Sequence, residues 1–466
     1  MFFSKRIGRK RLSLAKPDYI ERKNGRHLFI WKDVPHWMII DDEFSQLLTR
    51  CDGQKPLETV LAGVSGERTL DKLLLSEIRN LISLGILKDA QARTKTKNID
   101  QQQPIPLENI AINITRRCNL RCPFCYNLEA PAGNGDNDLT CDEIITFLRE
   151  TKSALSRKPS LALVGGEPLE FPEKVIAVSN YAIKHRFNTL VSTNGTKITD
   201  QFAQQAREIG LEVQVSIDGH NAETNDPLRG KGTFEKASRG IQILVRHGVY
   251  TIMCMICHSG NFEYLQDFYE LADSLGVNEA RFIPLKHVGG GAKCNLKPVN
   301  MEEMMKKAVR IFNNRKDLRR LMGRDCFTIT ANTCRLSNKR PSCGTGLQTL
   351  LLDSDGTLYP CLNTNVNAFR VANIRDEGFN FVQTWNNSRV LNNVRKLTSI
   401  ENTNNACSKC LVRYWCLGGC RGETYATRGT LNTKASNCKD LHKSIIEMFW
   451  ILADNSNWIK TMTHIG

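Results

Sequence analysis

The middle of the chain alternates between two patterns of apolar residues. Six short segments between residues 107 and 300 have the apolar pattern of β-strands, and segments with helical spacing separate them. Thr140 and Glu143 form a T-x-x-E capping box, which predicts that a helix begins after the first strand. Strands that alternate with helices indicate parallel βαβ construction, so this unit is predicted to be α/β. The predicted strands are 110–114, 161–164, 189–192, 212–217, 250–256 and 280–283.

A smaller unit precedes the α/β unit. Residues 27–31 and 37–40 read as short strands around a turn, and Asp42 can cap a helix with an apolar face. A second apolar stripe with helical spacing ends at Gly85, which is typical of a C-terminal helix cap. The stripe consists of Leu74, Ile78, Leu81 and Ile82. The pattern predicts a small domain of helices and a hairpin.

Composition divides the remainder of the chain. Residues 91–106 are polar, contain proline and have no periodicity, so they are predicted to be an interdomain linker. The expected units are a basic arm (1–16), the small domain (17–90), the linker (91–106), the α/β unit (107–300), a bridging segment (301–340), a cysteine-rich unit (341–443) and a C-terminal helix (444–466).

Charge and cysteine usage restrict the class of protein. The 466 residues carry a formal net charge of +16, which would suit a polyanion or an acidic peptide as partner. The basic arm contributes to this charge, and its simplest interpretation is a solvated tail. No apolar run of membrane-spanning length and no signal-peptide pattern is present, so no membrane contact and a cytoplasmic location are expected. Seventeen cysteines in such a chain favour metal ligation over disulfides.

One cysteine cluster follows the first strand of the α/β unit. Cys118, Cys122 and Cys125 have the spacing C-x3-C-x2-C. A four-iron cluster normally takes four cysteines, so three thiolates from one loop would leave one iron open. A structural zinc site would need a fourth Cys or His nearby. Three unrelated core cysteines are the simplest alternative, and core packing is also our interpretation of Cys254 and Cys257.

The cysteine-rich unit has a second pattern. Asp355 and Gly356 give a hairpin signal between two of its cysteines. A zinc ribbon would use four cysteines, and the presence of seven predicts two interleaved metal sites. The seven are Cys343, Cys361, Cys407, Cys410, Cys416, Cys420 and Cys438.

The cysteine loop and the segments that follow the strands resemble the radical S-adenosylmethionine (SAM) superfamily. Short motifs, Gly165–Pro168, Ser192–Gly195, Ser216–Gly219 and Asn225–Gly230, each follow a predicted strand in the family's order. The resemblance implies a partial (β/α)6 TIM-type barrel and a [4Fe-4S] cluster at Cys118, Cys122 and Cys125 whose open iron is chelated by SAM. The implied SAM-contacting residues are Phe124, Gly165, Gly166, Glu167, Ser192, Asn194, Ser216, Asp218 and Arg229.

The cysteine-rich unit is similar to the SPASM domain, which holds two auxiliary [4Fe-4S] clusters, giving three clusters in all. The resemblance assigns Cys343, Cys361 and Cys420 to the first auxiliary cluster. It assigns Cys407, Cys410, Cys416 and Cys438 to the second. The first then lacks a fourth ligand. Cys334, the nearest cysteine upstream, is our candidate, and an open site that binds substrate is the alternative.

Residues 17–90 look like the PqqD-like winged-helix module that recognises precursor peptides by adding a strand to a sheet edge. A generic winged helix that binds DNA is the alternative for this module alone. The order of the three domains resembles maturases of ribosomally made peptides. It implies that reductive cleavage of SAM yields a 5′-deoxyadenosyl radical, which abstracts hydrogen from a precursor peptide bound by residues 17–90. An external donor such as flavodoxin or ferredoxin would supply the electron.

The sequence does not identify the type of bond that such an enzyme would form. A thioether from Cys sulfur to carbon is favoured on family frequency, with carbon–carbon or carbon–oxygen crosslinks as alternatives. Anaerobic sulfatase maturases carry an aspartate where this chain has Leu362, and they lack the N-terminal module. No nucleic-acid substrate is expected, because the N-terminal module has no obvious Arg- and Lys-rich recognition helix. A non-enzymatic electron-transfer protein would not need the motifs that follow the strands.

Overall fold

The computed structural model describes residues 7–63, 72–91, 106–127, 137–402 and 407–459. Its core is an eight-stranded sheet whose strand order is β11-β10-β9-β8-β7-β6-β12-β13. Every neighbouring pair from β11 to β12 is parallel, and only β12 and β13 are antiparallel. The strands are β6 (Leu107–Asn113), β7 (Leu155–Val164), β8 (Asn188–Thr193), β9 (Glu212–Ser216), β10 (Thr251–Cys257), β11 (Glu279–Pro284), β12 (Thr349–Leu352) and β13 (Leu358–Tyr359).

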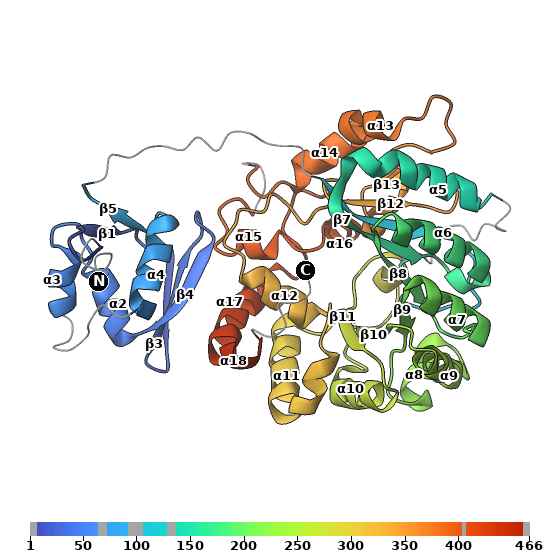
Figure 1. Ribbon diagram of the computed structural model, residues 1–466, viewed down its shortest axis with the longest axis horizontal. Helices are drawn as coiled ribbons and strands as arrows, with labels where there is room; N and C mark the ends of the chain where they lie inside the picture. Colours follow the sequence, from blue (N-terminus) through green and yellow to red (C-terminus); the bar gives the residue numbers. More distant parts are fainter. Residues whose placement is uncertain (1–6, 64–71, 92–105, 128–136, 403–406, 460–466) are drawn as a thin grey trace.

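The first six of these strands in chain order confirm the predicted α/β unit. Helices alternate with them and cover the outside of the curved sheet (Figure 1). The capping box is present at the start of α5, where the Thr140 side chain and the Glu143 carboxylate each accept a backbone hydrogen bond. The helices are α5 (Cys141–Glu150), α6 (Pro172–Lys184), α7 (Asp200–Ile209), α8 (Ala222–Arg229), α9 (Thr233–Arg246) and α10 (Leu265–Ser274).

The cysteine-rich unit contributes to this sheet. Strand β12 pairs in parallel with β6, the strand that precedes the first cysteine loop. The predicted hairpin follows, and Gly356 at its turn has φ of +89°. We expected the barrel and the cysteine-rich unit to be consecutive domains, but they share one hydrogen-bonded sheet.

The N-terminal domain contains a three-stranded antiparallel sheet with the order β2-β3-β4. It comprises β2 (Tyr19–Lys23), β3 (Arg26–Trp31), β4 (His36–Asp41), α2 (Asp42–Thr49), α3 (Leu57–Ala62), α4 (Lys72–Ser83) and β5 (Leu87–Asp89). Gly85 has φ of +72° after α4, which confirms the predicted helix end. The cap of α2 is Asp41 rather than Asp42, because the Asp41 side chain accepts from Phe44 N at 2.7 Å.

The basic arm is more than a solvated tail. Its residues Leu12–Leu14 form strand β1, which pairs with β5, and Leu12 is buried. Ile7, Leu12 and Leu14 of the arm therefore take part in the N-terminal core, and Lys10 forms an ion pair with Asp89 of β5.

Helix α17 (Cys438–Asp454) lies between the N-terminal domain and the barrel (Figure 1). Trp37 of β4 stacks on Phe449 of α17 with ring centroids 4.6 Å apart. One face of the N-terminal sheet, including Leu28 and Ile30, belongs to the same apolar cluster as the barrel, and the other face packs on the domain's own helices. Both faces of this sheet are therefore covered.

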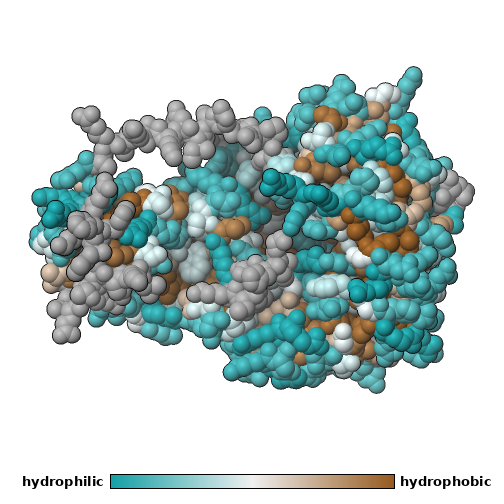
Figure 2. Space-filling model, in the orientation of Figure 1, coloured by the Kyte–Doolittle hydropathy of each residue, from teal (hydrophilic) through white to brown (hydrophobic). Residues whose placement is uncertain are grey.

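Shorter elements complete the C-terminal half. They are α11 (Met301–Asn314), α12 (Cys326–Cys334), α13 (Phe381–Asn387), α14 (Arg389–Thr398), α15 (Arg413–Cys416), α16 (Arg421–Arg428) and α18 (Ser456–Ile459). The face of the molecule seen in Figure 2 is largely hydrophilic. None of the described helices combines the length and the apolar character needed to cross a membrane.

Candidate iron–sulfur and SAM site

Cys118, Cys122 and Cys125, which we call the loop triad, lie directly beyond the carboxyl end of β6. Burial is the largest cause that raises the pKa of all three thiols, and with the neighbouring thiols of Cys118 and Cys125 the pKa of Cys122 is raised to about 11. The three sulfurs are therefore near enough to interact and are largely shielded from water. Thiols in this state require a metal to be held as thiolates.

The segments after the next strands hold the cysteine loop. Gly166 N donates to Thr115 O at 2.7 Å, and Glu167 N donates to Arg117 O at 2.7 Å. A Cβ at Gly166 would lie 2.1 Å from Arg117 O. Gly165 and Gly166 let the backbone approach the cysteine loop closely, and their implied contact with SAM stays a prediction.

Further contacts come from the loops after β8 and β11. Asn194 Nδ2 donates to Asn119 Oδ1 at 2.8 Å, and Gly290 N donates to Cys125 O at 2.8 Å. A Cβ at Gly290 would lie 2.5 Å from Pro123 O. The cysteine loop is thus fixed by backbone on several sides, which pre-organises its thiols.

Glu167 is buried and organises two loops. Its carboxylate accepts from Leu169 N at 2.9 Å, from Thr193 Oγ1 at 2.6 Å and from Asn194 N at 2.7 Å. Burial raises the pKa of Glu167, and these hydrogen bonds oppose that change. The carboxylate therefore holds the β7 and β8 loops in place.

Asp218 and Arg229 form a buried pair beside the loop triad. Arg229 Nε donates to Asp218 Oδ2 at 2.6 Å, and Asp218 Oδ1 accepts from Ile256 N at 2.7 Å. The Arg229 guanidinium lies 5.8 Å from the centroid of the Phe124 ring. Its charge lowers the pKa of Cys122 against the larger effect of burial. A fixed guanidinium next to an aromatic ring could bind a carboxylate and a flat ring of one ligand.

The two serines predicted to contact SAM lie on neighbouring strands. Ser192 Oγ accepts from Gln214 Nε2 at 3.0 Å, and Ser216 is the last residue of β9, paired in register with Cys254. Cys254 and Cys257 are both buried, as their core interpretation predicts.

The sequence analysis did not predict the contact that holds the segment before the loop triad. The buried Asp353, in the hairpin of the cysteine-rich unit, accepts from Asn113 Nδ2 at 2.9 Å and forms an ion pair with Arg116. These partners are more than 230 positions apart in the chain. No local pattern could have predicted the contact.

Cys343, Cys361 and Cys420, the C-terminal triad, lie together as the resemblance implies. Burial, and after it the thiols of Cys420 and Cys343, raise the pKa of Cys361 to about 11. Hydroxyl and amide groups point at the sulfurs, since Thr364 Oγ1 donates to Cys361 Sγ and Asn363 Nδ2 to Cys420 Sγ, both at 3.4 Å.

Cys407, Cys410, Cys416 and Cys438, the C-terminal tetrad, form a separate group. Burial, and after it the other three thiols, raise the pKa of Cys416 to about 12. Cys334 is fully buried, and the thiol that interacts with it is Cys416 of the tetrad. The structure thus places Cys334 beside the second group and not in the C-terminal triad, because α12 directs this residue into the core between the domains.

Among the residues that the structure describes, no three His, Cys, Asp or Glu side chains are arranged to hold a single metal ion. Thiols that bind different irons of one cubane stand farther apart than the ligands of one ion. The mutual interaction of the thiols fits an iron–sulfur cluster in each of the three groups.

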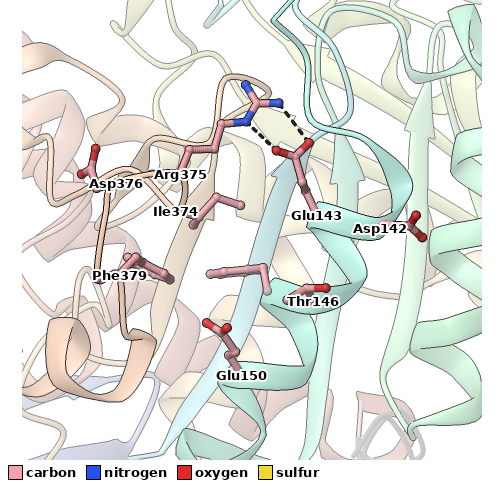
Figure 3. Close-up of a pocket in the computed structure, with 10 residues that line it drawn as sticks. Asp142, Glu143, Thr146, Glu150, Ile374, Arg375, Asp376 and Phe379 are labelled. Carbon is pink, nitrogen blue, oxygen red and sulfur yellow. Dashed lines mark hydrogen bonds and ion pairs between the residues drawn. The ribbon is translucent and has the colours of Figure 1, made fainter.

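A surface hollow of about 450 Å³, which none of the triad or tetrad cysteines lines, lies between α5 and the segment 374–379 (Figure 3). Arg375 forms a two-point ion pair with Glu143, at 2.6 and 2.9 Å, at its rim. The pair ties the cysteine-rich unit to the helix that follows the loop triad. Its Arg375 partner lowers the pKa of Glu143 to about 2.

We expect Arg375→Gln to lower the melting temperature slightly, by the equivalent of about 0.5 kcal/mol, because both side chains are about a third exposed. The stabilisation is present above the ordinary carboxyl pKa and is lost as the pH falls toward about 2. The difference from wild type should therefore be constant from neutral pH to about pH 5 and shrink below it. Arg239→Gln, in a wholly exposed pair with Glu235, should change nothing. A difference that grows in acid would contradict this account.

Comparison with known proteins agrees with the geometry. Residues 112–273 match the radical SAM superfamily, and residues 343–411 match the SPASM iron–sulfur cluster-binding domain. An AdoMet-dependent heme synthase of Methanosarcina barkeri is 30% identical over 339 residues, which cover 69% of this chain and 93% of that protein. The mycofactocin maturase MftC of Mycobacterium ulcerans is 28% identical, over 70% of this chain and 86% of that protein.

Two solved structures share the fold. The enzyme anSMEcpe with bound AdoMet and a peptide has a TM-score of 0.59 at 19% identity, covering 75% of this chain and 99% of that one. Streptococcus suis SuiB bound to S-adenosylmethionine has a TM-score of 0.59 at 15% identity, covering 92% of this chain and 100% of that one. The chain is therefore an enzyme of the radical SAM superfamily with a SPASM domain, and its cofactors are S-adenosylmethionine and more than one [4Fe-4S] cluster.

Proposed function

We propose that this enzyme modifies a ribosomally made precursor peptide. It cleaves SAM reductively at the loop triad, abstracts hydrogen from the peptide and installs a crosslink, with a thioether from Cys sulfur to carbon favoured. Carbon–carbon or carbon–oxygen crosslinks and a sulfatase-maturase-like oxidation are the alternatives. The observation that carries the proposal is the N-terminal sheet domain, which packs directly on the C-terminal half through α17. The relatives include a mycofactocin maturase, and a structure of SuiB contains the precursor peptide SuiA.

Each group of cysteines has an assigned role in this proposal. The loop triad would ligate three irons of the cluster that binds SAM, which would supply the electron for the cleavage of SAM. The C-terminal triad would hold the first auxiliary cluster, and its fourth iron would be open to substrate, since the thiol that affects Cys334 is Cys416 of the tetrad. The four thiols of the C-terminal tetrad would hold the second auxiliary cluster, so that each of its irons has a protein ligand.

The residues around the loop triad bind and orient SAM. Phe124 packs near the adenine, and Arg229, held by Asp218, pairs with the SAM carboxylate. Gly165, Gly166 and Glu167 bind the amino group, while Ser192, Asn194 and Ser216 contact the remainder of the molecule. Glu167, Asn194 and Asp218 are buried and help to exclude water from the reacting atoms.

The leader of the precursor peptide binds an edge of the N-terminal sheet. Both faces of this sheet are packed, so unpaired backbone groups remain only along the edge strands β2 and β4. A peptide strand can satisfy these groups, and the pattern of side chains along the edge would provide specificity.

The experiment uses anaerobically reconstituted enzyme, SAM, dithionite and a short peptide encoded beside the gene. We expect the peptide to lose two hydrogen masses per crosslink, with 5′-deoxyadenosine formed in equal amount. Iodoacetamide should no longer label the Cys of a thioether product. A peptide of unchanged mass, despite cleavage of SAM, would contradict the proposal.

We expect leader binding to slow amide hydrogen exchange in only one edge strand, β2 or β4. An added strand protects the edge that it pairs with and leaves the opposite edge exposed. Hydrogen exchange with mass spectrometry on the full chain measures the protection. Deleting residues 17–90 is a poorer test, because it would uncover Phe449 and its apolar neighbours on α17. Equal protection of both edge strands, or of neither, would contradict the proposal that the leader pairs with one edge of the N-terminal sheet.

A tetrapyrrole substrate is the second candidate, because an AdoMet-dependent heme synthase is 30% identical to this chain. That match leaves almost a third of this chain without a counterpart, whereas SuiB is similar over 92% of it. If an iron porphyrin is decarboxylated in the same assay while the peptide is unchanged, this second function replaces the first.

A further inference from the structure

Arg421 is a charged side chain in the interior of the SPASM domain. It is 0% exposed and is the largest fully buried side chain among the described residues. It is the first residue of α16 and follows Cys420 of the C-terminal triad. A guanidinium keeps its charge in any protein environment, so its burial requires compensation.

The contacts of Arg421 direct it toward the other group of cysteines. Nη1 donates to Leu431 O at 3.2 Å and to Thr433 O at 2.8 Å, and Nη2 donates to Cys407 Sγ at 3.7 Å. Nε is buried and has no hydrogen-bond partner. The backbone at Arg421 thus adjoins one group of cysteines, and its side chain contacts the tetrad.

Two glycines make this approach possible. A Cβ at Gly418 would lie 1.7 Å from Arg421 Nη2. Leu417, Gly418 and Gly419 all have positive φ, which turns the chain sharply around the guanidinium. A side chain at Gly418 would displace the Arg421 guanidinium from Cys407. The glycine in this turn therefore allows the contact between Arg421 and Cys407.

No carboxylate compensates this charge within ion-pair distance, as far as the described ranges extend. Other buried cations in the molecule have such a partner, for example Arg229 with Asp218 and Arg281 with Glu279. A [4Fe-4S] cluster with four thiolates carries a net charge of two minus, and one-electron reduction adds a third negative charge. A cluster in the tetrad would supply the missing counter-charge.

We propose that Arg421 is the electrostatic counter-charge of the second auxiliary cluster and raises its reduction potential. The inference rests on the proposed ligand role of the tetrad. A nearby cation stabilises the more negative, reduced cluster relative to the oxidised one, and a hydrogen bond to a ligating sulfur acts in the same direction. Arg421 would therefore favour transfer of an electron to this cluster.

The test is a redox titration of the full chain, reconstituted anaerobically and followed by electron paramagnetic resonance. A Cys118→Ala/Cys122→Ala/Cys125→Ala background leaves only auxiliary clusters, and the signal lost in Cys438→Ala identifies the tetrad. Arg421→Gln removes the charge, Arg421→Lys keeps it, and Arg428→Gln removes an exposed charge from the same helix.

In Arg421→Gln we expect the ratio of oxidised to reduced tetrad cluster at a fixed potential to rise at least tenfold, which is about 59 mV for one electron. Arg421→Lys, Arg428→Gln and the other auxiliary cluster should keep their potentials. If the cluster assembles with Lys but not with Gln, the requirement for the charge is also supported.

Three results would overturn the inference: an unchanged potential in Arg421→Gln, equal shifts in the Gln and Lys variants, or loss of the cluster in both. If the wild-type chain binds no cluster at the tetrad, the proposed ligand role of the tetrad is wrong. Iron content therefore distinguishes failure of the ligand assignment from failure of the inference about Arg421.

Discussion

Replacing Cys118, Cys122 and Cys125 together by alanine is expected to reduce SAM cleavage to the background without enzyme. The three thiols lie on one loop beyond β6, interact with one another and are next to the Asp218–Arg229 pair. Without them no cluster can present an open iron there. Anaerobic reconstitution with iron analysis and quantification of 5′-deoxyadenosine measure the effect.

The auxiliary clusters provide the internal control for this variant. The C-terminal triad and tetrad are built by other segments, so their iron should be retained while the total falls by the iron of one cluster. Undiminished 5′-deoxyadenosine formation in the triple variant would contradict the assignment of the loop triad as the ligands of the cluster that binds SAM.

The second large effect is expected for Gly166→Ala. A Cβ at this position would lie 2.1 Å from Arg117 O, a backbone atom that cannot rotate away. Overpacking of this kind costs about 3 kcal/mol or more unless the chain shifts, and a shift would displace the cysteine loop. We expect the variant to lose the iron of the loop triad and nearly all SAM cleavage.

Gly63→Ala is the matched control for this substitution. Gly63 also has an ordinary φ, and the atom nearest to its added Cβ is the end of the flexible Arg50 side chain at 3.5 Å. Its iron content and activity should equal those of wild type. If Gly166→Ala behaves like Gly63→Ala, the cysteine loop is not held by close backbone packing.

Local patterns predicted local structure well. The Thr140–Glu143 capping box, the helix end at Gly85 and the turn at Gly356 depend on a few adjacent residues, and all three are present. The error at the start of α2 is of one residue, because Asp41 and Asp42 are chemically equivalent as caps and only the backbone conformation selects between them.

Contacts between distant segments were not predictable in this way. Cys334 was assigned by counting along the chain, but α12 places it beside Cys416. Asp353 and Arg421 carry no motif of their own, and their importance follows from partners that the fold brings to them. The spacing of Cys118, Cys122 and Cys125 predicted one group of thiols, whereas the division of the C-terminal thiols into two groups was implied by the resemblance to the SPASM domain.

The pairing of β12 with β6 affects how this enzyme can be divided or expressed in parts. A fragment that ended at residue 340 would expose the full hydrogen-bonding edge of β6 and leave Arg116 without Asp353. A bare, apolar central strand of this kind recruits other chains and aggregates. Truncation at the apparent domain boundary would therefore produce an insoluble barrel, and grafting this SPASM domain onto another barrel would require transfer of β6 with it.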